Sequence, residues 1–429
     1  MNALKRIFGG DTRQFGMIIA LVALVLFFQI FTGGKVLTPT NMINLFNGNS
    51  YILVLAIGMV LVIIAGHIDL SVGSVAAAVG IVVAIAMRDW GIPWYLGILL
   101  GLVLGAAIGA WQGFWVAYVG IPAFIVTLAG MLLFRGANQF VGKSLTVPVP
   151  DEFRVMGAGF LPEIGDFARY NAPTVILGFL LIAVVVFLEF RSRRIEARTG
   201  ATPDPLWIPV TRLVLLAGAV LYVTWLFSTG RYGTSFPVSG LILVGLVAVY
   251  VFITSKTVLG RHVYAVGGNR HAAELSGVQS KKVNFLVMMN MSILAALAGM
   301  MFVARSTSSG PADGVGWELD AIAAVFIGGA AVSGGVGTVI GSIVGGLVMA
   351  VLNNGLQLLS VGSDMQSIIK GLVLLIAVAI DVYNKSQGRR SIIGMLTNGL
   401  RSNQPATAQK ETVKTSEIIT PAEPAESPK

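Results

Sequence analysis

The sequence predicts an all-α integral membrane protein with about 10 to 12 transmembrane helices, because its apolar residues gather in segments of membrane-crossing length. Each such helix takes ~20 residues to cross the ~30 Å hydrocarbon core. Hydrophobic residues make up 55% of the 429 residues and charged residues only 11%, whereas soluble domains carry about 25% charged residues. The chain has no cysteine and three histidines. Disulfides and thiolate metal sites are therefore excluded, and a histidine metal centre is not expected.

Apolar segments follow one another through most of the chain. The first comes after "MNALKRIFGGDTRQF", which has a basic start and no obvious small-residue cleavage site. We expect this segment to be retained as a span, although an uncleaved signal anchor has the same pattern. The least regular segments lie around residues 66–73 and 328–341. The predicted spans begin near Gly16, Tyr51, Val72, Trp94, Pro122, Thr174, Ile208, Pro237, Val283, Leu319, Gly337 and Gln366.

Lysine and arginine residues predict the orientation of these spans. Cytoplasmic loops carry an excess of both residues, and most of the 29 basic residues fall on one side if the N-terminus is inside. We predict a cytoplasmic N-terminus at 1–15, a transmembrane domain at 16–384 with a cytoplasmic loop at 255–282, and a cytoplasmic tail at 385–429. The end of the tail, "RSNQPATAQKETVKTSEIITPAEPAESPK", lacks aromatic residues and is expected to be disordered.

Two short glycine-rich stretches interrupt the apolar pattern. "AGHIDLSVGSV" and "GGAAVSGGVGTV" both contain G-x4-S-x-G, and broken helices in corresponding halves of a chain are typical of transport pathways. Asp69 in the first stretch is either a functional intramembrane carboxylate or a turn or N-cap residue. We predict that residues of both stretches line the pathway: Gly66, His67, Asp69, Ser71, Gly73, Gly328, Gly329, Ser333 and Gly335.

Glycine also recurs every four residues in "GILLGLVLGAAIGAWQG", from Gly97 to Gly113. This spacing places the glycines on one helix face, where a neighbouring backbone can approach closely. Four charged residues near other spans have simple interpretations. Arg135 and Lys370 lie near predicted outer ends, where long basic side chains reach the headgroups, and Glu318 and Asp320 precede a span that they are expected to cap.

The polar loop contains the sequence "GNRHAAELSGV". Asn269 is a good N-cap and Gly277 a good helix stop, so a helix of about two turns is predicted between them, which is too short to be stable alone. A soluble partner on the cytoplasmic side would supply the missing packing surface. The alternative is a connector that lies on the membrane.

No sequence motif points to nucleotide binding or catalysis by the chain itself. No carboxylate pair or Ser/His/Asp set suggests an enzyme site. "GANQFVGKS" has five residues between its glycines, where a phosphate loop has four. The chain is therefore not expected to be an enzyme.

Several of these stretches resemble one known family. "GRHVYAVGGNRHAAELSGV", "AGHIDLSVGS", "IPAFIVTLAGMLLFRG", "ELDAIAAVFIGGAAVSGGVGTVIG" and "VLNNGL" are similar to membrane permeases of monosaccharide ABC importers. The likeness is greatest to the branch for ribose, xylose and galactose, and within it to xylose and multiple-monosaccharide permeases. It runs from about residue 16 to residue 381, and His67 stands where the family commonly has glycine.

The resemblance implies an ABC importer permease fold in a bacterial inner membrane, with a permease homodimer and two cytoplasmic ATPases. A sugar-binding protein outside would deliver a monosaccharide such as xylose. The permease itself would bind no cofactor, because ATP and Mg²⁺ belong to the ATPase. The residues that couple the permease to the ATPase would be Gly268, Asn269, Ala272, Ala273, Glu274, Leu275, Ser276 and Gly277.

Two other classes compete with this expectation. An ion-coupled secondary transporter is expected to carry buried carboxylates or His/Arg relays in several spans, which most spans here lack. A non-transporting scaffold or receptor fits poorly with so many glycine-rich helices.

Overall fold

The computed structural model describes residues 12–162, 164, 166–167, 170–198, 205, 207–229 and 235–386. Residues 1–11 of the predicted N-terminal segment at 1–15 and residues 387–429 of the predicted tail at 385–429 lie outside the described residues.

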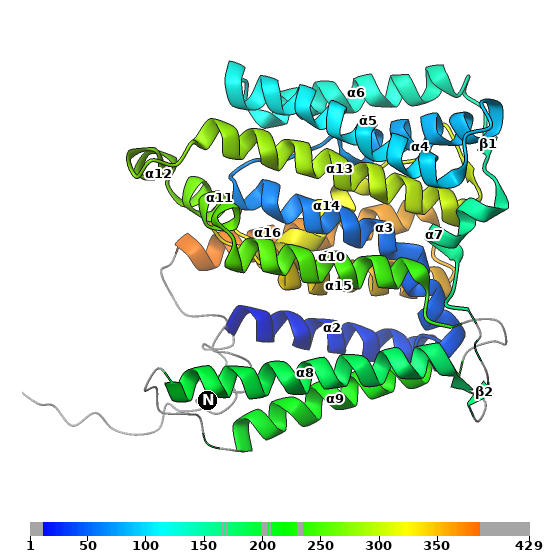
Figure 1. Ribbon diagram of the computed structural model, residues 1–429, viewed down its shortest axis with the longest axis vertical. Helices are drawn as coiled ribbons and strands as arrows, with labels where there is room; N and C mark the ends of the chain where they lie inside the picture. The colour runs from blue at the N-terminus through cyan, green and yellow to red at the C-terminus, as the bar shows by residue number, and fades with distance from the viewer. Residues whose placement is uncertain are drawn as a thin grey trace, which may run out of the picture. The chain divides into compact units, whose positions relative to one another are not determined.

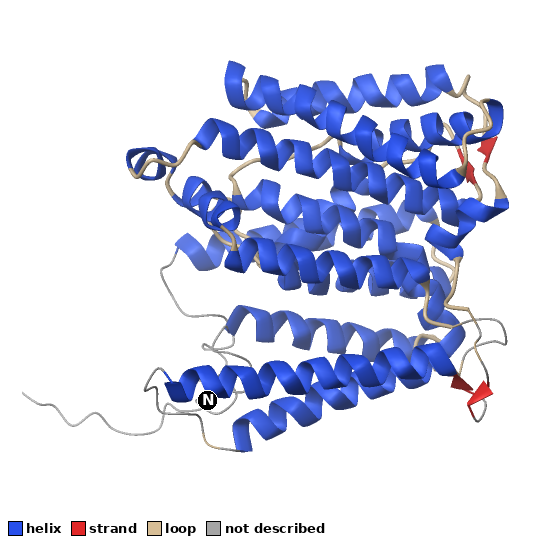
Figure 2. Ribbon diagram, viewed as in Figure 1, coloured by secondary structure: helices blue, strands red, loops and turns tan. Residues whose placement is uncertain are grey.

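Helices dominate the part of the chain that is described (Figures 1 and 2). Within it, nine helices are long and apolar enough to cross a membrane, which confirms the predicted all-α membrane fold. They are α3 (Pro39–Ile64), α4 (Val72–Asp89), α5 (Trp94–Phe114) with its π-helical continuation η1 (Trp115–Val119), α6 (Ala123–Val141), α8 (Ala172–Arg198), α9 (Trp207–Ser228), α10 (Val238–Lys256), α13 (Ser280–Ser306) and α15 (Val339–Leu358).

Three other helices correspond to the remaining predicted spans: α2 (Thr12–Phe31), α14 (Trp317–Ile327) and α16 (Ser363–Ser386). The apolar part of α2, Gly16–Phe31, is shorter than the nine long helices. The prediction of a full span beginning near Leu319 is wrong. With 11 residues, α14 is about 16 Å long at 1.5 Å per residue. It ends at Ile327 with Gly328 as its C-cap, because the next residue, Gly329, has a left-handed φ of +81° that the helix cannot continue through.

The remaining elements are short and lie at the two ends of the bundle (Figure 1). One end holds α11 (Val258–Gly268) and α12 (Arg270–Leu275), and we call it the coupling end. The other holds η2 (Asp151–Arg154), α7 (Val155–Ala158) and four short strands. β1 (Val147–Pro148) pairs with β4 (Ser308–Ser309), and β2 (Asp166–Phe167) pairs with β3 (Tyr170–Asn171), both antiparallel.

The centre of the bundle is α3, in which every residue from Ile52 to Ile64 is buried. It packs against α10, α13, α14 and α15. A helix that is apolar on all faces is stable where other helices surround it, and this position explains why α3 shows no polar side in its second half.

The glycine stripe of α5 faces α13. A side-chain carbon at Gly105 would lie 2.6 Å from the Cβ of Ala296, and one at Gly109 would lie 2.6 Å from the Cα of Met289. The two helices therefore touch along their backbones, as the spacing of the glycines predicts.

The α8–α9 hairpin makes most of its contacts within itself. Gly178 of α8 packs on Thr224 of α9, and α9 reaches the bundle through a ring contact between Phe227 and Phe46 of α3. Glu189 of α8 lies 3.7 Å from Arg212 of α9. In Figure 1 the two helices lie side by side along one flank.

Candidate functional site at the coupling end

The predicted short helix is present as α12 (Arg270–Leu275). The Asn269 side chain accepts a hydrogen bond from the backbone N–H of Ala272 at 3.0 Å. At the other end, Gly277 has a φ of +85°, which lets the chain turn away without strain. Both caps predicted from the sequence are therefore confirmed.

The side chains of α12 divide into an inward and an outward set. Ala273 is buried, whereas Leu275 is 79% exposed. Glu274 accepts hydrogen bonds from the Ser280 hydroxyl and from Arg270 Nε, the latter at 3.0 Å. These two donors, Ser280 first, hold the pKa of Glu274 below its ordinary value. Leu275 is thus the α12 side chain that exposes the most apolar surface, whereas the Glu274 carboxylate is hydrogen-bonded within the loop.

Three segments far apart in sequence meet beside α12 through their backbones. The N–H of Gly335 donates to the carbonyl oxygen of Ile64 at 2.8 Å, and the Tyr264 hydroxyl donates to the carbonyl of Gly337 at 2.7 Å. A side-chain carbon at Gly267 would overlap the Ile64 oxygen and lie 2.9 Å from the Gly335 nitrogen. We call Ile64, Gly267 and Gly335 the glycine junction.

The glycine junction joins the loop at 255–282 to the two glycine-rich stretches predicted to break the helices, at residues 66–73 and 328–341. Gly66 and Gly334 also touch, since a side-chain carbon at Gly334 would lie 3.0 Å from the Cα of Gly66. The end of α11 therefore contacts both the end of α3 and the loop at 328–338. Sequence reasoning missed Ile64, Tyr264 and Gly267, because no local pattern marks a contact between distant segments.

The predicted pathway residues occupy two different environments. Gly66 and Ser333 are exposed, and His67, Gly329 and Gly335 are partly exposed, whereas Asp69, Ser71, Gly73 and Gly328 are buried. Asp69 is fully buried, and its Oδ1 accepts hydrogen bonds from the N–H and the hydroxyl of Ser71 at 2.8 and 2.6 Å. The Ser71 hydroxyl in turn accepts from Gln112 Nε2 at 2.8 Å. Asp69 therefore forms a turn immediately before α4.

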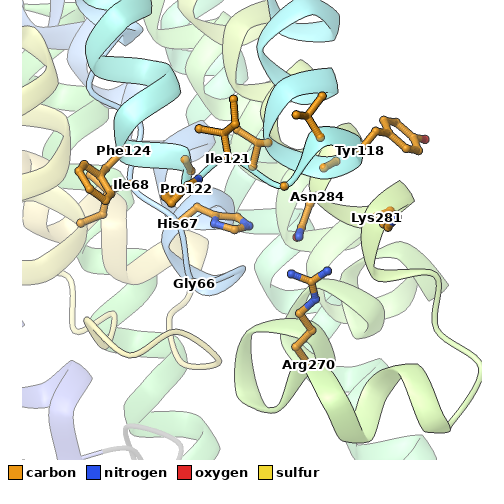
Figure 3. A pocket seen from close by; sticks show the side chains of 15 residues that line it. Gly66, His67, Ile68, Tyr118, Ile121, Pro122, Phe124, Arg270, Lys281 and Asn284 are labelled. Carbon is orange, nitrogen blue, oxygen red and sulfur yellow. The ribbon is translucent and has the colours of Figure 1, made fainter.

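A cavity of about 420 Å³ opens at this end between the first break, η1, the start of α6, α12 and α13. Its polar side chains are His67, Tyr118, Arg270, Lys281 and Asn284. Figure 3 shows the imidazole of His67 pointing toward Asn284, with the guanidinium of Arg270 below both. His67 and Arg270 thus connect this cavity to the first break and to α12.

A second polar cluster lies between α14, α6 and α16 and consists of two pairs of opposite charge. Glu318 of α14 is 3.9 Å from Arg135 of α6, and Asp320 accepts a hydrogen bond from Lys370 of α16 at 3.1 Å. Neither Glu318 nor Asp320 is the N-cap of α14, which is Gly316; both acids lie in its first turn. Arg135 and Lys370 form ion pairs instead of only reaching toward headgroups. The sequence did contain a signal for this pairing, because the acidic and the basic residues lie at similar depths of different spans.

A bundle of membrane-crossing helices with irregular backbone at one end is the architecture of a membrane transport permease. The chain belongs to the family described as branched-chain amino acid transport system permease components, whose model matches residues 41–378.

Two curated relatives of the chain are xylose transport system permease proteins. The one from Haemophilus influenzae is 40% identical over 372 residues, covering 86% of this chain and 96% of the relative. The one from Escherichia coli K12 is 39% identical, covering 87% and 93%. The ribose import permease protein of Escherichia coli K12 is 33% identical, covering 82% and 87%. No solved structure matches the chain.

Proposed function

We propose that this chain is the transmembrane permease subunit of an ATP-driven importer for a monosaccharide such as xylose or a related pentose or hexose. The observation that carries the proposal is the glycine junction, which links an exposed, self-capped helix to both breaks of the bundle. The names of the relatives support a sugar as the substrate. Affinity for the sugar would reside mainly in an extracytoplasmic binding protein that delivers it.

In this mechanism α12 docks in a groove of a cytoplasmic ATPase, and Leu275 supplies apolar contact there. ATP and Mg²⁺ are bound by the ATPase. A ligand changes a conformational equilibrium only if it binds the two states with different affinity, and ATP on the partner supplies that difference. Closure of the ATPase displaces α12, and the glycine junction passes the displacement to α3 and the loop at 328–338. Two copies of the permease would enclose the pathway.

The basic residues support the same orientation. Arg261, Arg270, Lys281 and Lys282 all belong to the coupling end, which places that end in the cytoplasm of a bacterium if the excess of positive charge is inside. The protein would then be a multi-pass protein of the inner membrane, with both termini in the cytoplasm.

Ion-coupled sugar transport is the second candidate, and buried carboxylates are the observation in its favour. Glu318 and Asp320 are each paired with a cation, Arg135 and Lys370. Asp69 is fully buried and has no cation among its hydrogen-bond partners in the described part of the chain, and it is therefore the carboxylate to test. Uptake driven by ion coupling would stop on addition of a protonophore and would persist without the ATPase.

Co-purification with the cytoplasmic ABC ATPases of the same organism tests the proposal. We expect a stoichiometric complex for the wild type and its loss in Leu275→Asp, because an exposed apolar contact is replaced by a charge. Leu145→Asp is the matched control, since Leu145 is 64% exposed at the opposite end of the bundle. Glu274→Arg is less informative, because it also breaks the hydrogen bonds that organise the loop. Failure of the wild type to bind any ATPase would favour ion coupling.

A further inference from the structure

The cavity beside α12 is lined by positive and neutral groups only. Arg270 and Lys281 carry the charge, and none of the residues lining it is a carboxylate. Arg270 Nε donates to Glu274, while the guanidinium extends toward His67 and Asn284 (Figure 3). His67 Nε2 is buried without a hydrogen-bond partner in the described structure and can donate to an anion when it carries the proton, whereas Asn284 Oδ1 is an acceptor and can only receive a hydrogen bond. The two cationic side chains and the lack of a carboxylate in the lining suit an anion with several oxygen atoms.

The rim of the cavity is apolar and exposed. Tyr118 and Phe124 both line the cavity, and they are 48% and 54% exposed. Beyond them the surfaces of η1 and α6 carry further exposed apolar side chains, among them Val119, Ile125 and Leu128. A free phosphate ion would make no use of this surface, whereas the acyl chains of a phospholipid would lie along it.

We propose that this cavity binds the phosphate of an anionic phospholipid of the cytoplasmic leaflet. Basic pockets between transmembrane helices on the cytoplasmic side are suited to anionic head groups. The phosphate lies between Arg270 and Lys281, and the acyl chains follow Phe124 and the outer face of α6. Binding requires only that the coupling end meets the cytoplasmic leaflet.

Occupancy of the cavity would also affect transport. Arg270 is the first residue of α12, and His67 follows directly on Gly66 in the first break. A head group held by both sides would connect the coupling helix to the break and favour one arrangement of the glycine junction. This regulatory part of the inference rests on the proposed function, whereas the lipid site itself does not.

Lipid retention by the isolated full-length permease tests the site without any ATPase. The purified protein is mixed with phosphatidylglycerol and phosphatidylcholine, and bound lipid is counted by native mass spectrometry. We expect preferential retention of phosphatidylglycerol. Lys281→Gln should weaken it roughly fivefold, the factor expected for one basic residue near an anionic surface. Lys282→Gln is the matched control, because Lys282 is the next residue, equally charged and exposed, and does not line the cavity.

Four results would overturn the lipid site. If Lys281→Gln and Lys282→Gln reduce the retention of phosphatidylglycerol equally, the lipid is held by diffuse charge attraction. If neither variant reduces it, Lys281 is excluded as a ligand of the phosphate. Displacement of the lipid by inorganic phosphate at millimolar concentration would assign the cavity to a free anion. Displacement by xylose would assign it to the sugar pathway. Because the ATPase is absent from this measurement, each result is separate from success or failure of the co-purification experiment.

Discussion

Replacing Gly267 by alanine should uncouple ATP hydrolysis from transport. The added methyl carbon would overlap the carbonyl oxygen of Ile64 and lie 2.7 Å from its carbonyl carbon, a distance that non-bonded carbons do not tolerate. Its neighbours are backbone atoms, which cannot rotate away as a side chain can. Overpacking of this kind costs roughly 1–3 kcal/mol, and the strain falls on the contact through which α11 meets α3.

The size of the functional effect follows from that strain. The strain changes the conformational equilibrium if the methyl group separates Gly267 from Ile64 more in one state than in the other. A free-energy difference of about 1–3 kcal/mol between the two states shifts the ratio of their populations by about 5- to 150-fold. We expect the complex with the ATPase to form normally, ATP hydrolysis to continue, and sugar uptake per ATP to fall within that range. The assay is uptake of labelled xylose into proteoliposomes with parallel measurement of phosphate release.

A helical glycine outside the predicted coupling residues provides the control. A side-chain carbon at Gly245 of α10 meets no atom within 4 Å, so Gly245→Ala adds the same methyl group to a helix without a collision. It should keep the wild-type ratio of uptake to hydrolysis. If the two alanine variants behave alike, the glycine junction does not transmit motion, and the mechanism proposed for α12 loses its structural path.

Two further predictions concern charged groups. Lys370→Met should destabilise the protein by about 3–5 kcal/mol, because it leaves the Asp320 carboxylate buried without its partner, and Asp320→Asn should cost less, because the Lys370 side chain is 29% exposed. The double variant should recover most of the Lys370→Met loss in thermal unfolding in detergent; additive losses would contradict the pairing. The pKa of Glu274 is lowered in the folded protein, chiefly by the Ser280 hydroxyl. The ionised carboxylate therefore contributes fully to the stability of the loop above the ordinary pKa of about 4.3. This contribution is lost as the pH falls through the lower pKa of the folded protein. Hydrogen exchange of the α12 amides should therefore accelerate on acidification below that range, and Ser280→Ala should reduce the effect; exchange that does not depend on pH beyond its intrinsic rate would refute it.

The sequence predicted the local features of the site better than its long-range contacts. Asn269 and Gly277 were recognisable because a cap acts on residues within one turn of itself. Likewise, the glycine stripe of α5 depends only on helical spacing. The contacts of Gly267 with Ile64 and Gly335 join segments that are remote in the chain, and nothing in the residues around each one records the others.

The length of α14 was mispredicted for a different reason. Hydropathy stays high through Gly328 and on to Val332, so an apolar loop and an apolar helix cannot be separated by composition. The same limit applies to Glu318 and Asp320, which look like ordinary first-turn acids. Their pairing with Arg135 and Lys370 depends on how α6 and α16 pack around α14, which the pattern of a single segment does not contain.

The charge pair between Glu189 and Arg212 bears on how the chain enters the membrane during synthesis. Both residues lie within apolar spans, Ala172–Ile195 and Trp207–Ser228. A charged side chain such as Arg or Asp costs about 2.5–3.5 kcal/mol at the centre of a span, and the cost is smaller for Glu189 and Arg212, which lie toward the ends of their spans. When α8 and α9 partition together, each charge brings its own counter-charge into the lipid and part of that cost is avoided. The hairpin is therefore best delivered to the bilayer as one unit, with α8 held back until α9 can accompany it.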